Sequence, residues 1–133
     1  MATGTFAVTR NKNIEADTEG RHNIYFGTLA ASASADTYAA GGLVASFAGI
    51  SGIPQTEPPV RVDIWSETPG NAFVFKYITG TTSANGKVAI FTTNTVNLGV
   101  NAPVVEMTAA TALGAAIFGD TKLRFEARFV SGR

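Results

Sequence analysis

Few side chains in this sequence are equipped for chemistry. There is one histidine, His22, and there is no cysteine, which excludes a multi-histidine zinc site and any thiolate metal site. His22 follows Arg21 at the start of an alternating segment, where a solvated or interfacial imidazole is the ordinary case. We assign it no catalytic role.

Acidic residues offer two further arrangements. Glu15, Asp17 and Glu19 alternate in a polar stretch, and such carboxylates are the oxygen ligands that Ca²⁺ accepts. The spacing lacks the glycine and the terminal glutamate of a complete calcium loop, so a solvated loop is the simpler interpretation. Asp63 and Glu106 form a formal acid and base pair, but no local pattern ties them together.

The glycine-rich segments do not match a phosphate-binding loop. Gly41-Gly42 and residues 49–52 are not followed by the lysine-serine or lysine-threonine pair that meets phosphates in such loops. With so few acids, bases and nucleophiles, the sequence predicts a protein that is not an enzyme and that uses no cofactor or metal.

The composition indicates a surface that is covered in part by other proteins. Of the 133 residues, 45% are apolar and 15% are charged, against about 25% charged in a typical soluble domain. Ten basic residues balance ten acidic ones, so no long-range positive field attracts nucleic acid or a membrane. The N-terminus has no signal-peptide pattern, and no apolar stretch approaches the roughly 20 residues that cross a bilayer. We expect one domain over residues 1–133, made in the cytoplasm.

Alternation of apolar and polar residues is the dominant pattern, and it predicts β-strands. The clearest strand covers residues 121–130. Residues 73–78 and 87–93 form an expected antiparallel hairpin. Residues 60–65 are another strand, and two more lie near the start of the chain. The expected inward residues are Phe6, Val8, Ile24, Phe26, Thr28, Val60, Val62, Ile64, Phe73, Phe75, Tyr77, Leu123, Phe125, Ala127 and Phe129.

Helical patterns are few. A short helix is expected around residues 43–50, and residues 107–118 fit either a partial helix or a loop with one helical turn. The predicted fold class is therefore all-β, an antiparallel β-sandwich or jelly-roll-like barrel with at most one or two short helices.

Two apolar segments are expected to contact a partner. They are an N-terminal arm within residues 1–13 and a loop over residues 43–53. The expected contact residues are Phe6, Val8, Leu43, Phe47, Ile50 and Ile53. An edge strand and a core-covering loop explain the same two segments equally well. If the arm is a contact surface, deleting residues 2–12 leaves the rest of the domain folded.

A series of short features runs through the middle of the chain. It comprises Tyr38-Ala39-Ala40-Gly41-Gly42-Leu43, the aromatic strand at residues 72–77, the step Gly86-Lys87-Val88 and a charged closing strand at residues 122–130. In this order they resemble the decoration, or cement, proteins of tailed-phage capsids, over residues 22–130. The chain departs from that pattern at residues 79–85 and 94–116, so partner contacts made there are not transferred.

The resemblance implies a β-sandwich or jelly-roll-like domain that binds the exterior of an assembled capsid and has no catalytic residues. Its partner would be the major capsid protein, and it would form a homotrimer or a homodimer on the virion. Two alternatives remain open: another virion component, such as a tail or head-fibre base domain, and a carbohydrate-binding β-sandwich. In the latter, exposed Trp65 or Tyr25 would stack on a sugar ring.

Overall fold

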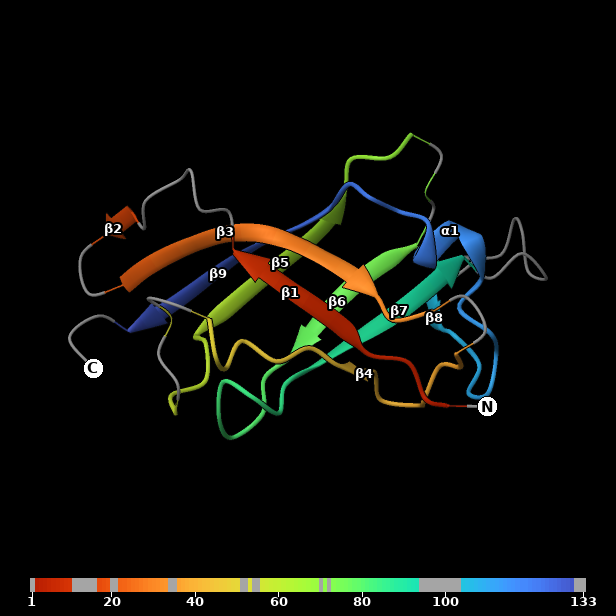
Figure 1. Ribbon diagram of the computed structural model, residues 1–133, viewed down its shortest axis with the longest axis horizontal. Helices are drawn as coiled ribbons and strands as arrows, with labels where there is room; N and C mark the ends of the chain where they lie inside the picture. Colours follow the sequence, from red (N-terminus) through yellow and green to blue (C-terminus); the bar gives the residue numbers. More distant parts are fainter. Residues whose placement is uncertain are drawn as a thin grey trace.

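The computed structural model of this chain describes residues 2–10, 17–19, 22–33, 36–50, 53, 56–69, 71, 73–93 and 104–130. Within these ranges the chain forms two antiparallel sheets and one short helix, α1 (Gly114–Phe118) (Figure 1). The first sheet has the order β1 (Phe6–Arg10), β3 (His22–Ala31), β9 (Leu123–Val130) and β5 (Arg61–Ser66), with β2 (Asp17–Glu19) also paired with β3. The second has the order β4 (Leu43–Val44), β7 (Lys87–Thr93) and β6 (Val74–Ile78), with β8 (Val104–Glu106) also paired with β7.

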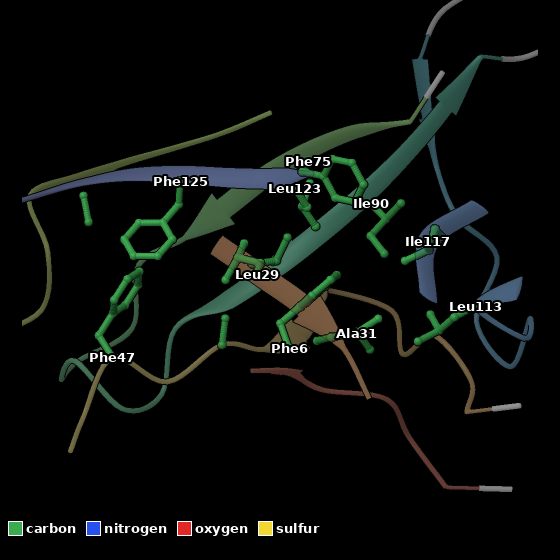
Figure 2. Packing of buried hydrophobic residues seen from close by; sticks show 14 of the residues in the cluster. Phe6, Leu29, Ala31, Phe47, Phe75, Ile90, Leu113, Ile117, Leu123 and Phe125 are labelled. Atoms are coloured by element: carbon green, nitrogen blue, oxygen red, sulfur yellow. The ribbon is translucent and has the colours of Figure 1, made fainter. Parts of the chain in front are cut away.

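The core lies between the two sheets. One cluster of buried side chains includes Phe125 and Phe129 of the first sheet together with Phe75 and Ile90 of the second. Phe47, from the connection after β4, packs against Phe125 with ring centroids 5.2 Å apart, at one end of the core (Figure 2). Edge-to-face aromatic contacts of this kind stabilise the packing beyond simple burial. The predicted all-β, antiparallel sandwich is confirmed.

The two sheets also meet at their sides. Phe6 of β1 forms a parallel bridge with Ala45, just after β4. On the opposite side, β5 borders β6. These lateral contacts give the sandwich some of the character of a flattened barrel.

The strands with the clearest alternation are confirmed. The residues of β9 that were expected to face inward, Leu123, Phe125, Ala127 and Phe129, are at most 1% exposed. The expected hairpin is the antiparallel pair of β6 and β7, with Phe75 opposite Ile90. Val62 and Ile64 of β5 pack against the core as expected, whereas Val60 precedes the strand and is 54% exposed.

The inward face of β3 is the opposite of the expected one. Tyr25, Leu29 and Ala31 belong to the core cluster, so Ile24, Phe26 and Thr28 are on the other face of the strand. Ile24 is nevertheless buried, at 6% exposed, outside that cluster. Gly27 lies opposite Phe125 on the inner face. A Cβ at Gly27 would lie 2.6 Å from that ring and 2.0 Å from the Thr9 carbonyl oxygen. Because the close packing requires a glycine here, the inner face lacks the apolar residue that would have marked it in the sequence.

The helix expected around residues 43–50 is absent. Leu43 and Val44 form β4, and the Phe47 amide then donates a hydrogen bond to the Ser83 carbonyl at 2.8 Å. This long-range contact holds the segment in a non-helical path that directs Phe47 into the core. For residues 107–118, α1 confirms the loop with a single helical turn.

Candidate interaction surface

The residues expected to contact a partner lie in or against the core. Phe6, Leu43, Phe47 and Ile53 are at most 3% exposed, and the partly buried Val8 and Ile50 pack against the same cluster. A buried side chain cannot form a docking surface without disrupting the fold. Phe6, Leu43, Phe47 and Ile53 are therefore core residues in this structure, as the edge-strand and core-covering interpretations of the two segments expect. Val8 and Ile50 are only partly buried, and their contact with a partner stays a prediction.

The described part of the N-terminal arm, residues 2–10, is integrated into the sandwich. β1 pairs along its whole length with β3. The Gly4 amide donates to the Thr37 carbonyl at 2.8 Å, and the Thr5 amide donates to Ser32 Oγ at 3.0 Å. Deleting residues 2–12 would remove an edge strand and the Phe6 side chain from the core. We therefore withdraw the expectation that the rest of the domain stays folded.

The outer surface of the second sheet carries exposed apolar side chains. Val74, Ile78 and Val44 are 51%, 44% and 40% exposed. Because their strands direct Phe75, Leu43 and Val88 inward, the alternating residues point outward. The cross-strand register places Lys76 opposite Ala89, and Lys87 opposite both Ile78 and Val44. We define the outer β6–β7 face as Val44, Val74, Lys76, Ile78 and Lys87.

The two lysines of this face have no acidic partner in the described part of the chain. Both side chains are exposed, and neither takes part in an ion pair. Among the described residues, neither positive charge is therefore paired with a carboxylate. Glu106, which lies opposite Phe91 on the same side of this sheet, is instead bound by Tyr38 and Gly41.

The outer surface of the first sheet differs in its charges. We define the outer β5–β9 face as Arg61, Asp63, Trp65, Arg124, Glu126 and Arg128. Its three arginines form ion pairs: Arg61 Nε lies 3.1 Å from Asp63 Oδ2, Arg124 Nε lies 2.7 Å from Glu67 Oε1, and Arg128 Nη2 lies 3.6 Å from Glu126 Oε1. Trp65 is 41% exposed and lies opposite Arg124 in the register. Positive and negative charges thus compensate each other on this face.

Asp120 is a buried carboxylate between α1 and β9. It accepts hydrogen bonds from the Ser66 hydroxyl, from Thr68 Oγ1 and Asn71 Nδ2 at 2.6 Å each, and from the Lys122 amide at 2.8 Å. Burial alone would raise the pKa of Asp120, but these four hydrogen bonds outweigh it and lower the pKa. Through these four hydrogen bonds, Asp120 joins the β5–β6 connection to the residues that precede β9.

The Tyr38-to-Leu43 motif forms a second polar node. Tyr38 Oη donates to Glu106 Oε1 at 2.6 Å, and the Ile90 amide donates to the same hydroxyl at 3.1 Å. The Gly41 amide also donates to Glu106 Oε1, at 2.7 Å. β4 and β8 pair with different parts of β7, and Tyr38 occupies the gap between them.

The electrostatics of this node follow from its hydrogen bonds and from burial. Burial and the bond to Glu106 raise the pKa of Tyr38 to about 12. The hydrogen bonds from Tyr38 and Gly41 lower the pKa of Glu106. Gly42, at φ +110°, approaches β7 so closely that a Cβ would lie 2.8 Å from the Val88 carbonyl carbon. The motif therefore has a structural role in joining the chain before β4 to β7.

Tyr77 carries a buried hydroxyl with no hydrogen-bond partner among the described residues. Burial raises the pKa of Tyr77 to about 12, so the phenol stays neutral at physiological pH. A Cβ at Gly86 would lie 1.8 Å from this oxygen. Gly86, part of the Gly86-Lys87-Val88 step, therefore leaves room for the Tyr77 side chain.

Asp63 and Glu106, the formal acid and base pair, are not brought together. Asp63 lies on β5 of the first sheet, beside Arg61, whereas Glu106 lies on β8 of the second sheet. His22 begins β3 opposite Glu19 of β2, and Glu15 lies outside the described residues. Within the described ranges no group of three or more histidine, cysteine, aspartate or glutamate side chains is placed to hold a metal ion.

Two further observations bear on partners. Tyr25 is buried in the core, and the Arg10 guanidinium lies 5.0 Å from the centroid of its ring, so Tyr25 is not an exposed stacking surface. In the part of the chain that the structure describes, no helix has the length and hydropathy required to cross a membrane.

Sequence reasoning missed the outer β6–β7 face, although its pattern is visible in the sequence. Val74 and Ile78 alternate on the side of β6 opposite Phe73, Phe75 and Tyr77. When a strand carries apolar residues on both faces, one face packs in the core, and the other is either covered by another part of the protein or exposed.

In comparisons with known proteins, no protein-family model, no curated protein and no solved structure matches this chain significantly.

Proposed function

We propose that this chain is a decoration protein of a tailed-phage capsid, bound to the major capsid protein on the outside of the virion as a homotrimer or homodimer. The observation that carries the proposal is the ordered set of family features, which occur in the same order along an all-β sandwich. The Tyr38-to-Leu43 motif precedes and enters β4, the aromatic strand and the Gly86-Lys87-Val88 step belong to the β6–β7 hairpin, and the charged closing strand is β9.

A decoration protein acts by mass action. It binds the assembled shell more tightly than it binds separate subunits, so each bound copy stabilises the shell. A stable contact of standard size buries about 1,600 Å² in total, with an apolar centre and a polar rim. The low charge content, 15% of residues, and the exposed apolar side chains of the second sheet favour such a contact.

The experiment is a binding titration on purified shells, assembled from the major capsid protein encoded in the same genome. We expect saturable binding at a fixed number of copies per capsid subunit and a higher shell melting temperature. Absence of saturable binding would refute the proposal. Imaging a labelled copy on the particle distinguishes a decoration protein from a tail or head-fibre base domain.

A carbohydrate-binding function is the second candidate, and the exposure of Trp65 favours it. Trp65 is 41% exposed and lies opposite Arg124, whose Nε donates to Glu67 Oε1, and sugars bind to aromatic faces flanked by such polar groups. A glycan-array signal that disappears in Trp65→Ala would support this function. Phe118→Ala is the matched control, because Phe118 is a similarly exposed aromatic residue, at 47%. A signal lost equally in both variants, or absent from the native chain, would exclude it.

A further inference from the structure

We propose that the outer β6–β7 face is the surface that docks on the shell, against an apolar patch of the major capsid protein with acidic residues at its rim. This inference rests on the proposed function and adds to it the docking face and the chemistry of the partner surface.

The first support is the arrangement of exposed apolar groups. Val74 and Ile78 lie two positions either side of Lys76 on β6, and Val44 of β4 lies across Lys87 of β7. All three apolar side chains are at least 40% exposed. The residue opposite Lys76 is the small Ala89, which is itself only 1% exposed. Ala89 therefore adds almost no exposed area, and the face is a continuous part of a regular sheet on which three exposed apolar side chains alternate with two lysines. Exposed apolar side chains grouped in this way are typical of a docking surface.

The second support is charge. Lys76 and Lys87 have no acidic partner within the described ranges, whereas the arginines of the outer β5–β9 face are paired with acids of their own chain. An uncompensated cation beside apolar surface is best matched by a carboxylate on the partner, which also selects the orientation of docking. The charge pattern therefore specifies an acidic rim on the partner.

The same charges argue against other occupants of this face. A two-fold contact between two copies would bring both pairs of lysines together on one small surface, and like charges there repel. Two lysines are also fewer than the roughly 4–8 basic residues of a typical polybasic lipid-binding cluster. A complementary acidic protein surface remains the best match.

The test compares shell binding of variants at two exposed valines, one within the outer β6–β7 face and one outside it. Val74 and Val60 are matched, at 51% and 54% exposure, and only Val74 belongs to the outer β6–β7 face. We expect Val74→Asp to weaken binding to the shells by about tenfold or more, because it places a carboxylate against an acidic rim and removes an apolar contact. Val60→Asp should bind within about twofold of the native chain, as expected for a surface substitution outside the interface. Both variants should melt at the native temperature.

Three further variants test the charge. Lys76→Glu should weaken shell binding, Lys76→Arg should retain most of it, and Lys122→Glu is the control, because Lys122 is exposed outside the face. Native binding should also weaken as the salt concentration rises.

The outcomes separate the two proposals. If the native chain binds shells and the variants on the face bind equally well, the docking face is wrong and the proposed function stands. If the native chain does not bind shells, the proposed function fails and the docking face fails with it. A drop in the oligomer mass of Val74→Asp, measured in solution without shells, would show that a second copy occupies the face and would overturn the inference.

Discussion

The two outer faces of the sandwich differ in how their cations are compensated. On the outer β5–β9 face, the arginines lie within 3.6 Å of carboxylates of the same chain. On the outer β6–β7 face, two lysines stand among exposed valine and isoleucine side chains without such partners in the described residues. A face whose charges are already paired gains little by binding a charged partner, whereas an unpaired face retains that capacity. Charge pairing thus distinguishes the two faces more clearly than their hydrophobicity does.

The largest expected effect comes from the core that both faces share. Phe47→Ala should lower the free energy of unfolding by about 3–5 kcal/mol, because Phe47 is fully buried against Phe125, Phe129 and Tyr77. Chemical denaturation measures this loss. Val60→Ala, at an exposed position, should change stability little. A Phe47→Ala variant with native stability but without shell binding would return Phe47 to the contact surface.

A smaller loss of stability is expected from a substitution at the connection between the two sheets. Asp120→Asn should cost about 1–3 kcal/mol, because an amide cannot accept all the hydrogen bonds that the carboxylate receives and one donor is left unsatisfied. Equilibrium unfolding in urea measures the change. Asp63→Asn is the control, since Asp63 forms only an exposed ion pair with Arg61. Equal losses in both variants would contradict a special role for Asp120.

The pH dependence of stability should follow from the same carboxylates. The pKa values of Asp120 and Glu106 are lower in the folded protein than in the unfolded chain. Their contribution is therefore present above the unfolded pKa of about 4 and is lost as the pH falls through the lower, folded values. Unfolding curves between pH 7 and pH 2 should show this decline. The double variant Asp120→Asn/Glu106→Gln should decline less steeply, and an unchanged slope would refute the assignment.

The smallest expected effects are on the outer faces themselves. Arg124→Ala should cost up to about 1 kcal/mol, because it removes the ion pair with Glu67. Lys76→Ala should leave the free energy of unfolding unchanged within the error of a thermal melt, because Lys76 has no acidic partner among the described residues. A loss at Lys76 as large as that at Arg124 would show that Lys76 is compensated within the chain, and the contrast between the faces would disappear.

Local patterns predicted the strands whose inner face is marked by large apolar residues. In β9, four inward residues alternate with charged ones, and in the β6–β7 hairpin the two partners are close in sequence. The prediction of the inward face of β3 was wrong because Ile24, Tyr25 and Phe26 are consecutive large apolar residues and the inward Gly27 has no side chain. Alternation cannot show which face of a strand is buried when both faces carry apolar residues. In β3 the close packing of Phe125 also requires a glycine where an apolar side chain would have marked the buried face.

The candidate surface was harder to predict, because an apolar residue suits a core and an interface equally. Phe47 is directed inward by the bond between its own amide and the Ser83 carbonyl, 36 positions away. Phe6 is placed by its pairing with Ala31. Such long-range contacts decide whether a side chain is buried or exposed, and they cannot be predicted from the residues adjacent to it in the sequence. The outward position of Val74 and Ile78 follows from the alternation along β6 alone, so it could have been predicted from the sequence.

The lateral contacts of the sandwich have a consequence for crowding. The bridge from Phe6 to Ala45 and the proximity of β5 to β6 place a neighbouring sheet beside the outer strands, while Tyr38 occupies β7 between β4 and β8. Unoccupied strand borders are the usual templates for polymerisation between identical chains. Many molecules of this protein can therefore be held at high local density with less tendency to form intermolecular β-structure than an open sheet would have.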